Sequence, residues 1–204
     1  MFDREPNDDV RDFRKADHEV PAFYLNRWSP RAFRPDPVPE EDLLACFEAA
    51  RWAPSAYNEQ PWRFVYARTD EDRAKFASCL IEFNRAWAPM APVLIALCAK
   101  EFFSHEDAAN AHHAFDAGAA WASFALEATR RGYHCHAMAG FDADKARSVL
   151  GVPEGFRVVC FFVMGKKGPA DLLPEGMQKT EAPSGRRPVA ESAAEGAFPP
   201  EWGS

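Results

Sequence analysis

The stretch that follows the first clear helix, residues 51–64, holds the greatest density of side chains able to bind a polar ligand. It reads Arg-Trp-Ala-Pro-Ser-Ala-Tyr-Asn-Glu-Gln-Pro-Trp-Arg-Phe. Pro54 ends the helix because its ring clashes with the preceding turn. Ser55, Asn58 and Gln60 then place a hydroxyl and two amides before a strand-like run begins. A helix end with these groups suits a wall around a flat polar ligand.

A second cluster, at residues 27–31, reads Arg-Trp-Ser-Pro-Arg and alternates two cations with a hydroxyl. In an extended segment, side chains at alternate positions share one face. Two guanidinium groups with a hydroxyl between them match the oxygens of a phosphomonoester and its sugar-like chain. Residues 186–187 add another pair of arginines. Each basic cluster alone also fits a solvated surface patch, but with the polar helix end they suggest a phosphorylated ring cofactor.

Hydrophobic spacing indicates which elements position these groups. Apolar residues at helical spacing predict helices, and short apolar runs between turn signals predict strands. Thr69 and Asp142 are expected N-caps, whereas Gly132 and Gly151 are expected helix ends. The predicted helices are residues 40–53, 70–83, 106–131 and a short one after Asp142, and the predicted strands are residues 62–67, 92–99, 133–138 and 157–164.

Simple alternation of helices and strands would suggest a parallel α/β sheet. However, no glycine-rich phosphate loop follows any strand, which argues against a dinucleotide fold of the Rossmann type. The helix at 106–131 is rich in alanine and glycine, so another element can approach it closely. Residues 9–26 have a partly helical pattern that Pro21 interrupts, and residues 1–9 are polar and expected to be loose.

Composition narrows the class of protein. The 204 residues suffice for one domain with a hydrophobic core. A net charge of −7 argues against a nucleic-acid surface, which needs a basic face. Five scattered cysteines without a CxxC pair predict buried, reduced thiols in a cytoplasmic protein. The N-terminus is not typical of a signal peptide, and the longest apolar run is too short to span a bilayer, so no membrane partner is expected.

Several motifs occur in one order along most of the chain. They are Arg27-x-Ser29-x-Arg31-x-Phe33, Ala53-Pro54-Ser55-x-x-Asn58-x-Gln60-Pro61-Trp62, Asn84-x-x-Trp87-x-x-Ala91-Pro92, Gly140-Phe141-Asp142, Leu150-Gly151-Val152-Pro153, Gly165 and Arg186-Arg187-Pro188. From about residue 24 to about residue 190, this order and spacing resembles the nitroreductase family of flavin-dependent oxidoreductases. The element around Pro54 to Trp62 is the most specific of these motifs, whereas the arginine motifs alone are weak.

The resemblance implies an α+β fold in which helices flank a central mixed or antiparallel sheet. It also implies a bound FMN and an obligate, intertwined homodimer with two cofactor sites at its interface. Residues 1–204 would form a single domain of this kind, with about 166–204 as an extended arm around the partner subunit. The helix at 106–131 would lie at the dimer interface.

Individual roles follow from the resemblance by position. Arg27 and Arg186 correspond to phosphate ligands. Ser29 and Arg31 correspond to contacts with the ribityl chain and the pyrimidine edge of the flavin, and Asn84 to a hydrogen-bonding partner of that same edge. The C-terminal arm would bring Arg186 to the flavin of its own or of the neighbouring subunit.

Other positions would meet the flavin from the partner subunit or through the backbone. Pro54, Ser55 and Asn58 correspond to residues that reach the partner's flavin. Ala139 and Gly140 would pass their main chain beside the flavin N5, where a backbone N–H could orient the atom that accepts hydride. Three neighbours complete the candidate set: Trp28, Gln60 and Arg187.

The chain departs from the family pattern at three positions. Many members carry lysine near the position of Trp87, so Arg31 would have to supply the charge that stabilises reduced flavin. Ala139 stands where members often have glutamate, and Ser184 where they often have a second basic residue. These departures concern the redox potential and the hold on the phosphate.

The implied activity is two-electron reduction of nitroaromatics, quinones or flavins by NAD(P)H in a ping-pong cycle, with no catalytic side chain named. Alternatives are a non-catalytic FMN-binding or storage protein, and a flavin-dependent dehydrogenase or dehalogenase of the same fold. The short polar segment between Ala99 and Ala114 favours an open, promiscuous site. A metal site at His134 and His136 lacks a third ligand at suitable spacing, and Cys135 lies where thiols are usually inert.

Overall fold

The computed structural model describes residues 5–106 and 108–203. The chain divides into two compact units. The larger unit comprises residues 27–182, and the smaller unit comprises residues 1–26 and 183–204. The larger unit carries the sheet and most of the hydrophobic core.

One four-stranded antiparallel sheet forms the centre of the larger unit. Its strands are β1 (Trp62–Ala67), β2 (Val93–Lys100), β3 (His134–Met138) and β4 (Phe156–Gly165), in the spatial order β1-β2-β4-β3. Strand β2 is buried over almost its whole length because it lies inside the sheet and both of its faces are covered. The expected strands and the expectation of a mixed or antiparallel sheet are confirmed, and the parallel alternative is wrong.

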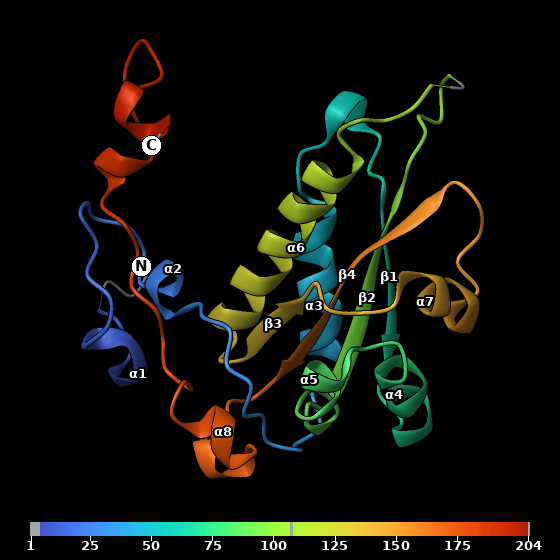
Figure 1. The fold of residues 1–204 in the computed structure, drawn as a ribbon, viewed down its shortest axis with the longest axis horizontal. Coiled ribbons are helices and arrows are strands. Elements are labelled where there is room, and N and C mark those ends of the chain that lie inside the picture. Colours follow the sequence, from blue (N-terminus) through green and yellow to red (C-terminus); the bar gives the residue numbers. More distant parts are fainter. Residues whose placement is uncertain (1–4, 107, 204) are drawn as a thin grey trace. The chain divides into compact units, whose positions relative to one another are not determined.

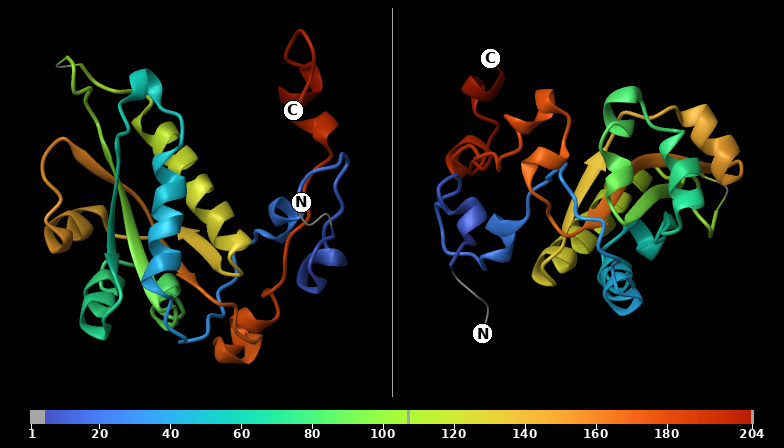
Figure 2. Two further views of the ribbon diagram at one scale, coloured as in Figure 1. Left: turned by 180° about the vertical axis from the view of Figure 1, so that it is seen from behind. Right: turned by 90° about the horizontal axis from the view of Figure 1, so that it is seen from below.

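Helices cover both faces of this sheet (Figures 1 and 2). On one face, α3 (Glu40–Arg51) packs against α6 (His113–Arg130), and Phe124 of α6 lies in a core with Ile95 and Phe162 of the strands. The other face is covered by three shorter helices, α4 (Asp70–Ala77), α5 (Glu82–Arg85) and α7 (Ala143–Leu150). There Phe76 packs edge-on against Phe161, with ring centroids 6.2 Å apart. The alanines of α6 allow α3 to approach it closely.

The helix expected over 40–53 ends at Arg51, and two other predicted helices are much shorter than the sequence pattern indicated. The helix expected over 70–83 ends at Ala77, because the next residues pair with the chain after β3. Leu80 forms a bridge with Phe141, and the Ile81 N–H donates to the Gly140 carbonyl at 3.2 Å. The helix expected over 106–131 begins only at His113. Before it, Phe102 forms a bridge with Ala109, whereas residue 107 lies outside the described residues.

Local end signals were predicted correctly. The Thr69 side chain accepts a hydrogen bond from the Asp72 N–H, and Asp142 accepts one from the Lys145 N–H. Gly132 follows α6 with φ of +80°, a left-handed conformation that costs glycine little because it has no Cβ. These ends depend only on neighbouring residues, so the sequence pattern suffices to locate them.

The smaller unit has little core. Its short helices are α1 (Asp8–Arg11), α2 (Phe23–Asn26), η4 (Val189–Glu191) and η5 (Pro200–Gly203). Among its described residues, only Val10, Ala22 and Pro183 are buried. The expected loose segment at 1–9 is described only from residue 5, and Asp8 already begins a helix. Within the expected arm, residues 166–182 belong to the larger unit and contain η3 (Ala170–Leu172) and α8 (Glu175–Gln178).

None of the described helices is long and apolar enough to cross a membrane.

Candidate functional site

The segment that carries Arg27, Ser29 and Arg31 is extended and anchored to the chain after β4. The Arg34 N–H donates to the Lys166 carbonyl at 2.9 Å, and the Gly168 N–H donates to the Ala32 carbonyl at 2.8 Å. At the start of this segment, the Arg27 guanidinium donates to the Ser29 hydroxyl, with Nη1 and Oγ 3.3 Å apart. The first cation and the hydroxyl therefore lie together, as their spacing predicts.

Arg31 is held by Glu181, a residue that sequence reasoning missed. Glu181 Oε1 accepts the backbone N–H groups of Arg31 and Ala32 at 2.7 and 2.8 Å. Its Oε2 lies 4.0 Å from Arg31 Nη1, and the Glu181 side chain is only 2% exposed. The guanidinium also lies 5.7 Å from the ring centre of Phe83. The charge of Arg31 is thus partly balanced by a buried carboxylate, and no local pattern around residue 181 marks it.

Two N–H groups of this segment are buried without a hydrogen-bond acceptor among the described residues. They are Trp28 Nε1 and Arg31 Nε. The Trp28 side chain is almost fully buried and meets the His134 ring edge-on, with ring centroids 6.0 Å apart. Buried donors without partners are costly, so they fit a ligand rich in acceptor oxygens.

The turn after α3 holds three non-glycine residues in the left-handed region. Tyr57, Asn58 and Gln60 have φ of 51°, 57° and 50°. Such residues persist only where their surroundings hold them, and they occur often at functional sites. Here Ser55 Oγ accepts the Gln60 N–H at 3.0 Å, and Gln60 Nε2 donates to the Asn58 carbonyl at 3.0 Å. The predicted group Ser55, Asn58 and Gln60 is therefore brought together as one hydrogen-bonded turn.

Glu59 fixes this turn to the segment that follows β2. Its carboxylate accepts the Ser104 N–H at 2.9 Å and the Ser104 hydroxyl at 2.5 Å, and it lies 3.6 Å from Lys100 Nζ. Hydrogen bonding from Ser104 lowers the pKa of Glu59, so the carboxylate stays charged. Tyr57 also meets the Phe103 ring at right angles, with centroids 5.7 Å apart. Sequence reasoning missed this connection, which joins residues 45 positions apart.

Asn84 and Gly140 form a third group. Asn84 is 7% exposed, and its Nδ2 donates to the Gly140 carbonyl at 2.9 Å. A Cβ at residue 140 would lie 2.5 Å from Ile81 Cδ1 and 2.8 Å from Asn84 Nδ2. A side chain at residue 140 would therefore force Ile81 or Asn84 to shift, while the preceding Ala139 is exposed.

Trp87 is part of the core. It has no exposed surface. Its ring lies between Phe33 and His136, with centroid distances of 6.4 and 4.6 Å. Trp87 therefore contacts the chain just after Arg31, through Phe33.

The cysteines and histidines show no feature of a metal or thiol centre. All five cysteines are free. Burial raises the pKa of Cys135 well above its ordinary value, which disfavours the nucleophilic thiolate. Within the described part of the chain, no three His, Cys, Asp or Glu side chains are grouped as metal ligands.

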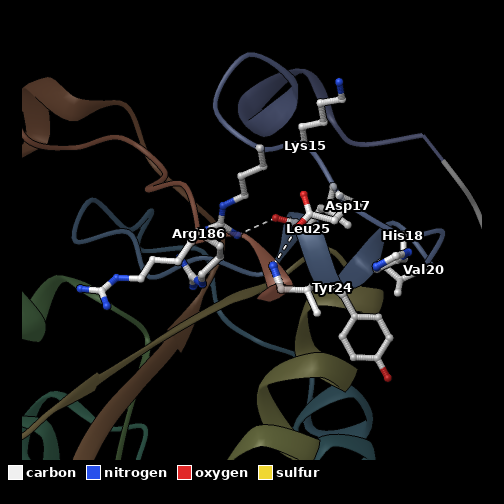
Figure 3. Close-up of a pocket in the computed structure, with 11 residues that line it drawn as sticks. Lys15, Asp17, His18, Val20, Tyr24, Leu25 and Arg186 are labelled. Carbon is white, nitrogen blue, oxygen red and sulfur yellow. Dashed lines mark hydrogen bonds between the residues drawn. The ribbon is translucent and has the colours of Figure 1, made fainter. Parts of the chain in front are cut away.

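Arg186 and Arg187 line a pocket of about 400 Å³ in the smaller unit (Figure 3). Arg14 and Lys15 line it as well, and both were missed in the sequence. Arg14 joins the N-terminal and C-terminal segments of this unit. Its Nη1 donates to the Leu25 carbonyl at 2.6 Å, and its Nε donates to the Ser184 carbonyl at 2.9 Å. The two predicted arginines thus share a basic pocket, and their role with Arg27, which belongs to the other unit, stays a prediction.

The predicted groups of the larger unit fall into two regions. Residues 27–31 are linked to Asn84 and Gly140 through the contact of Arg31 with Phe83 and through His136, whose Nδ1 lies 2.9 Å from the Pro30 carbonyl. The turn at 55–60 follows the C-terminal end of α3, whereas residues 27–31 precede its N-terminal end (Figure 1). A helix of 12 residues is about 18 Å long at 1.5 Å per residue.

Comparison with known proteins gives a consistent result. The sequence profile of the Nitroreductase family matches residues 24–90 and 80–166. A protein of Thermus thermophilus named NADH dehydrogenase is 32% identical over 174 residues, which cover 69% of this chain and 83% of that protein.

Solved structures agree with this match. A crystal structure described as an oxidoreductase containing FMN is 41% identical, covers 95% of this chain and 98% of its own, and superimposes with a TM-score of 0.88. A nitroreductase family protein from Streptococcus pneumoniae is 25% identical over 85% of this chain and 98% of its own, with a TM-score of 0.69.

Proposed function

This chain belongs to the nitroreductase family, and on that basis we propose that it is an FMN-dependent oxidoreductase that uses NAD(P)H to reduce electron-poor acceptors. The observation that carries the proposal is the family match over residues 24–90 and 80–166, because it spans every candidate group of the larger unit. The acceptors we propose are nitroaromatics, quinones or flavins. With a quinone, NAD(P)H and one proton yield NAD(P)⁺ and the hydroquinone.

The groups of the larger unit fit FMN in chemical type. A guanidinium and a hydroxyl at Arg27 and Ser29 suit a phosphate and a ribityl chain. The buried N–H groups of Trp28 and Arg31 lack hydrogen-bond acceptors among the described residues. FMN has acceptor oxygens on its phosphate, ribityl chain and pyrimidine ring. Asn84 is held in place by Gly140 and can offer its amide to the pyrimidine edge.

The chemical work of the reaction falls to the cofactor, and the chain binds and orients. When bound, FMN supplies a ring that can take up a hydride and pass two electrons onward. The backbone N–H at Gly140 would polarise the accepting nitrogen, and Arg31, balanced by Glu181, would moderate the charge near the pyrimidine. We assign no side chain as a catalytic acid or base.

We further propose that two copies of the chain form the working unit. Three large side chains near the turn are exposed: Trp52 by 72%, Tyr57 by 83% and Phe115 by 79%. An exposed group of this kind is typical of an interface. The separation of residues 27–31 from the turn by the length of α3 supports the same view, because a second copy could bring its own turn to the flavin.

We also propose that the site is open and accepts a broad range of acceptors. The described residues between β2 and α6 form a short connection rather than a large lid. NAD(P)H and the acceptor would then occupy the same face of the cofactor in turn, which predicts ping-pong kinetics. Initial rates at several fixed acceptor concentrations should give parallel double-reciprocal lines.

Purified protein provides the direct test. It should be yellow, release FMN on denaturation, and oxidise NADH or NADPH when a quinone is added. The colour should bleach under anaerobic conditions when the reduced nicotinamide alone is added. A colourless protein that fails to bind added FMN would overturn the proposal, and tight FMN binding without turnover would identify an FMN-storage protein instead.

A further inference from the structure

Residues 30–32 are held from two sides by side chains that come from distant parts of the chain. His136 lies on β3, and its Nδ1 is 2.9 Å from the Pro30 carbonyl, 106 residues away. Glu181 follows α8, and its Oε1 accepts the N–H groups of Arg31 and Ala32, about 150 residues away. One side chain therefore binds a backbone acceptor of the segment, and the other binds the next two backbone donors.

The donor and acceptor roles at His136 are determined by its partner. A carbonyl oxygen can only accept, so His136 Nδ1 must carry the proton. The imidazole packs on Trp87, with centroids 4.6 Å apart and planes 45° apart, and this packing fixes the direction of the N–H. Burial lowers the pKa of His136 below its ordinary value, which favours the neutral ring with that proton in place.

The role of Glu181 is equally specific. With a side chain 2% exposed, it satisfies two successive backbone N–H groups and also lies near the Arg31 guanidinium. Charge-assisted hydrogen bonds of this type are stronger than neutral ones. They leave the extended backbone at 30–32 few alternative conformations.

We propose that His136 and Glu181 are positioning residues that clamp residues 30–32 and thereby hold Ser29 and Arg31 in the geometry that contacts the ribityl chain and the pyrimidine edge of FMN. The inference rests on the proposed function, because it assumes that this segment receives the ribityl chain and the pyrimidine of FMN. A preorganised segment loses less conformational freedom on binding, and this raises affinity without a new contact. Neither side chain needs to touch the cofactor.

The test compares the affinity for FMN with the affinity for riboflavin, which lacks the phosphate. The variant His136→Phe keeps a ring against Trp87 but removes the N–H donor, whereas His136→Asn restores a donor at a similar position. We expect His136→Phe to weaken FMN binding about three- to tenfold, as for the loss of one hydrogen bond. Riboflavin keeps the ribityl chain and the ring, so it should lose affinity by a similar factor, and His136→Asn should recover most of both losses.

Glu181 gives a second, independent pair. Glu181→Leu removes both acceptors and should weaken FMN binding by about tenfold or more, whereas Glu181→Gln keeps a carbonyl for the two N–H groups and should retain most of the affinity. In the protein without FMN, hydrogen exchange at Arg31 and Ala32 should speed up in Glu181→Leu. If Glu181→Leu does not fold, the His136 pair alone decides the outcome.

Arg27→Ala separates the clamp from the proposed function. Should wild-type protein bind neither flavin, the proposed function and the clamp both fail. Should Arg27→Ala lose FMN affinity selectively while His136→Phe and Glu181→Leu bind FMN like wild type, only the clamp is refuted. Loss of FMN affinity with unchanged riboflavin affinity in the clamp variants would also refute it, because that pattern would place residues 30–32 at the phosphate.

Discussion

The Asp116 carboxylate on α6 accepts the backbone N–H of Ala56 at 3.1 Å and so ties the strained turn after α3 to the longest helix of the protein. Asp116 is 3% exposed, which is rare for a carboxylate. The turn includes three residues with positive φ, and each such conformation costs free energy that its surroundings must offset. This contact is therefore one of the restraints that keep Ser55 and Asn58 in place.

Replacement of Asp116 by alanine should loosen this turn. The variant leaves the Ala56 N–H without its acceptor, and we expect a loss of about 1–3 kcal/mol in the free energy of unfolding. Asp116→Asn keeps a carbonyl oxygen at the same place and should lose less. Urea unfolding measures both variants, and equal stability of Asp116→Ala and wild type would show that the turn is held by other contacts.

Replacement of Arg27 by alanine should weaken FMN binding. A hydrogen bond to a charged group contributes about 1.5–3 kcal/mol, which corresponds to roughly a tenfold to hundredfold loss of affinity. Fluorescence titration of the protein with FMN measures this change. The variant Arg34→Ala provides a control, because Arg34 pairs with Asp36 instead. Unchanged affinity in Arg27→Ala would place the phosphate elsewhere.

Substitution at Gly140 should damage the site through packing. A Cβ there would collide with Ile81 and Asn84, so Gly140→Ala must displace the Asn84 amide. We expect weaker flavin binding and a lower melting temperature. Gly176→Ala is the matched control, because a Cβ at residue 176 meets no atom within 4 Å. If the two variants behave alike in calorimetry and flavin titration, close packing is not the reason for glycine at residue 140.

An acidic side chain at Phe115 should disrupt the proposed dimer. Phe115 is 79% exposed on α6, and a buried carboxylate without a partner is strongly unfavourable at an interface. We expect Phe115→Asp to elute as a monomer in light-scattering chromatography and to lose FMN. Val149→Asp, at an exposed position on α7, should remain dimeric. A wild-type protein that is monomeric while it holds FMN would contradict the proposed assembly.

Asp42 should contribute to stability only where it is ionised. Its Oδ2 accepts the Tyr133 hydroxyl and its Oδ1 the Arg131 guanidinium, both at 2.7 Å. The Tyr133 hydrogen bond, followed by Arg131, lowers the pKa of Asp42 in the folded protein. A lowered pKa means that this stability is present above the unfolded value of about 3.9 and is lost as the pH falls through the folded value.

Substitution of Asp42 by asparagine should therefore flatten the acid limb of the stability curve. Urea midpoints recorded from about pH 6 to about pH 3 should fall less steeply for Asp42→Asn than for wild type. The exposed Asp171 offers a control, and Asp171→Asn should follow the wild-type curve. Parallel curves for Asp42→Asn and wild type would show that the folded and unfolded states bind the proton at Asp42 equally.

Much of the secondary structure was predictable because it depends on neighbours in sequence. The four strands, the N-caps at Thr69 and Asp142 and the helix end at Gly132 all follow from side chains within a few residues. The pairing of Arg27 with Ser29 likewise follows from alternation along an extended segment. For these features the amino-acid sequence alone was sufficient.

The tertiary structure decided the remainder, because the deciding contacts join residues far apart in the chain. The helix expected over 70–83 ends early since residues 79–81 bond to residues 140–142, a contact that no local pattern encodes. Glu181 reaches Arg31 and His136 reaches Pro30 only once α8 and β3 are packed. Sequence by itself thus indicated groups whose chemistry suits a phosphorylated ring, and long-range packing determined which of them are fixed by distant side chains.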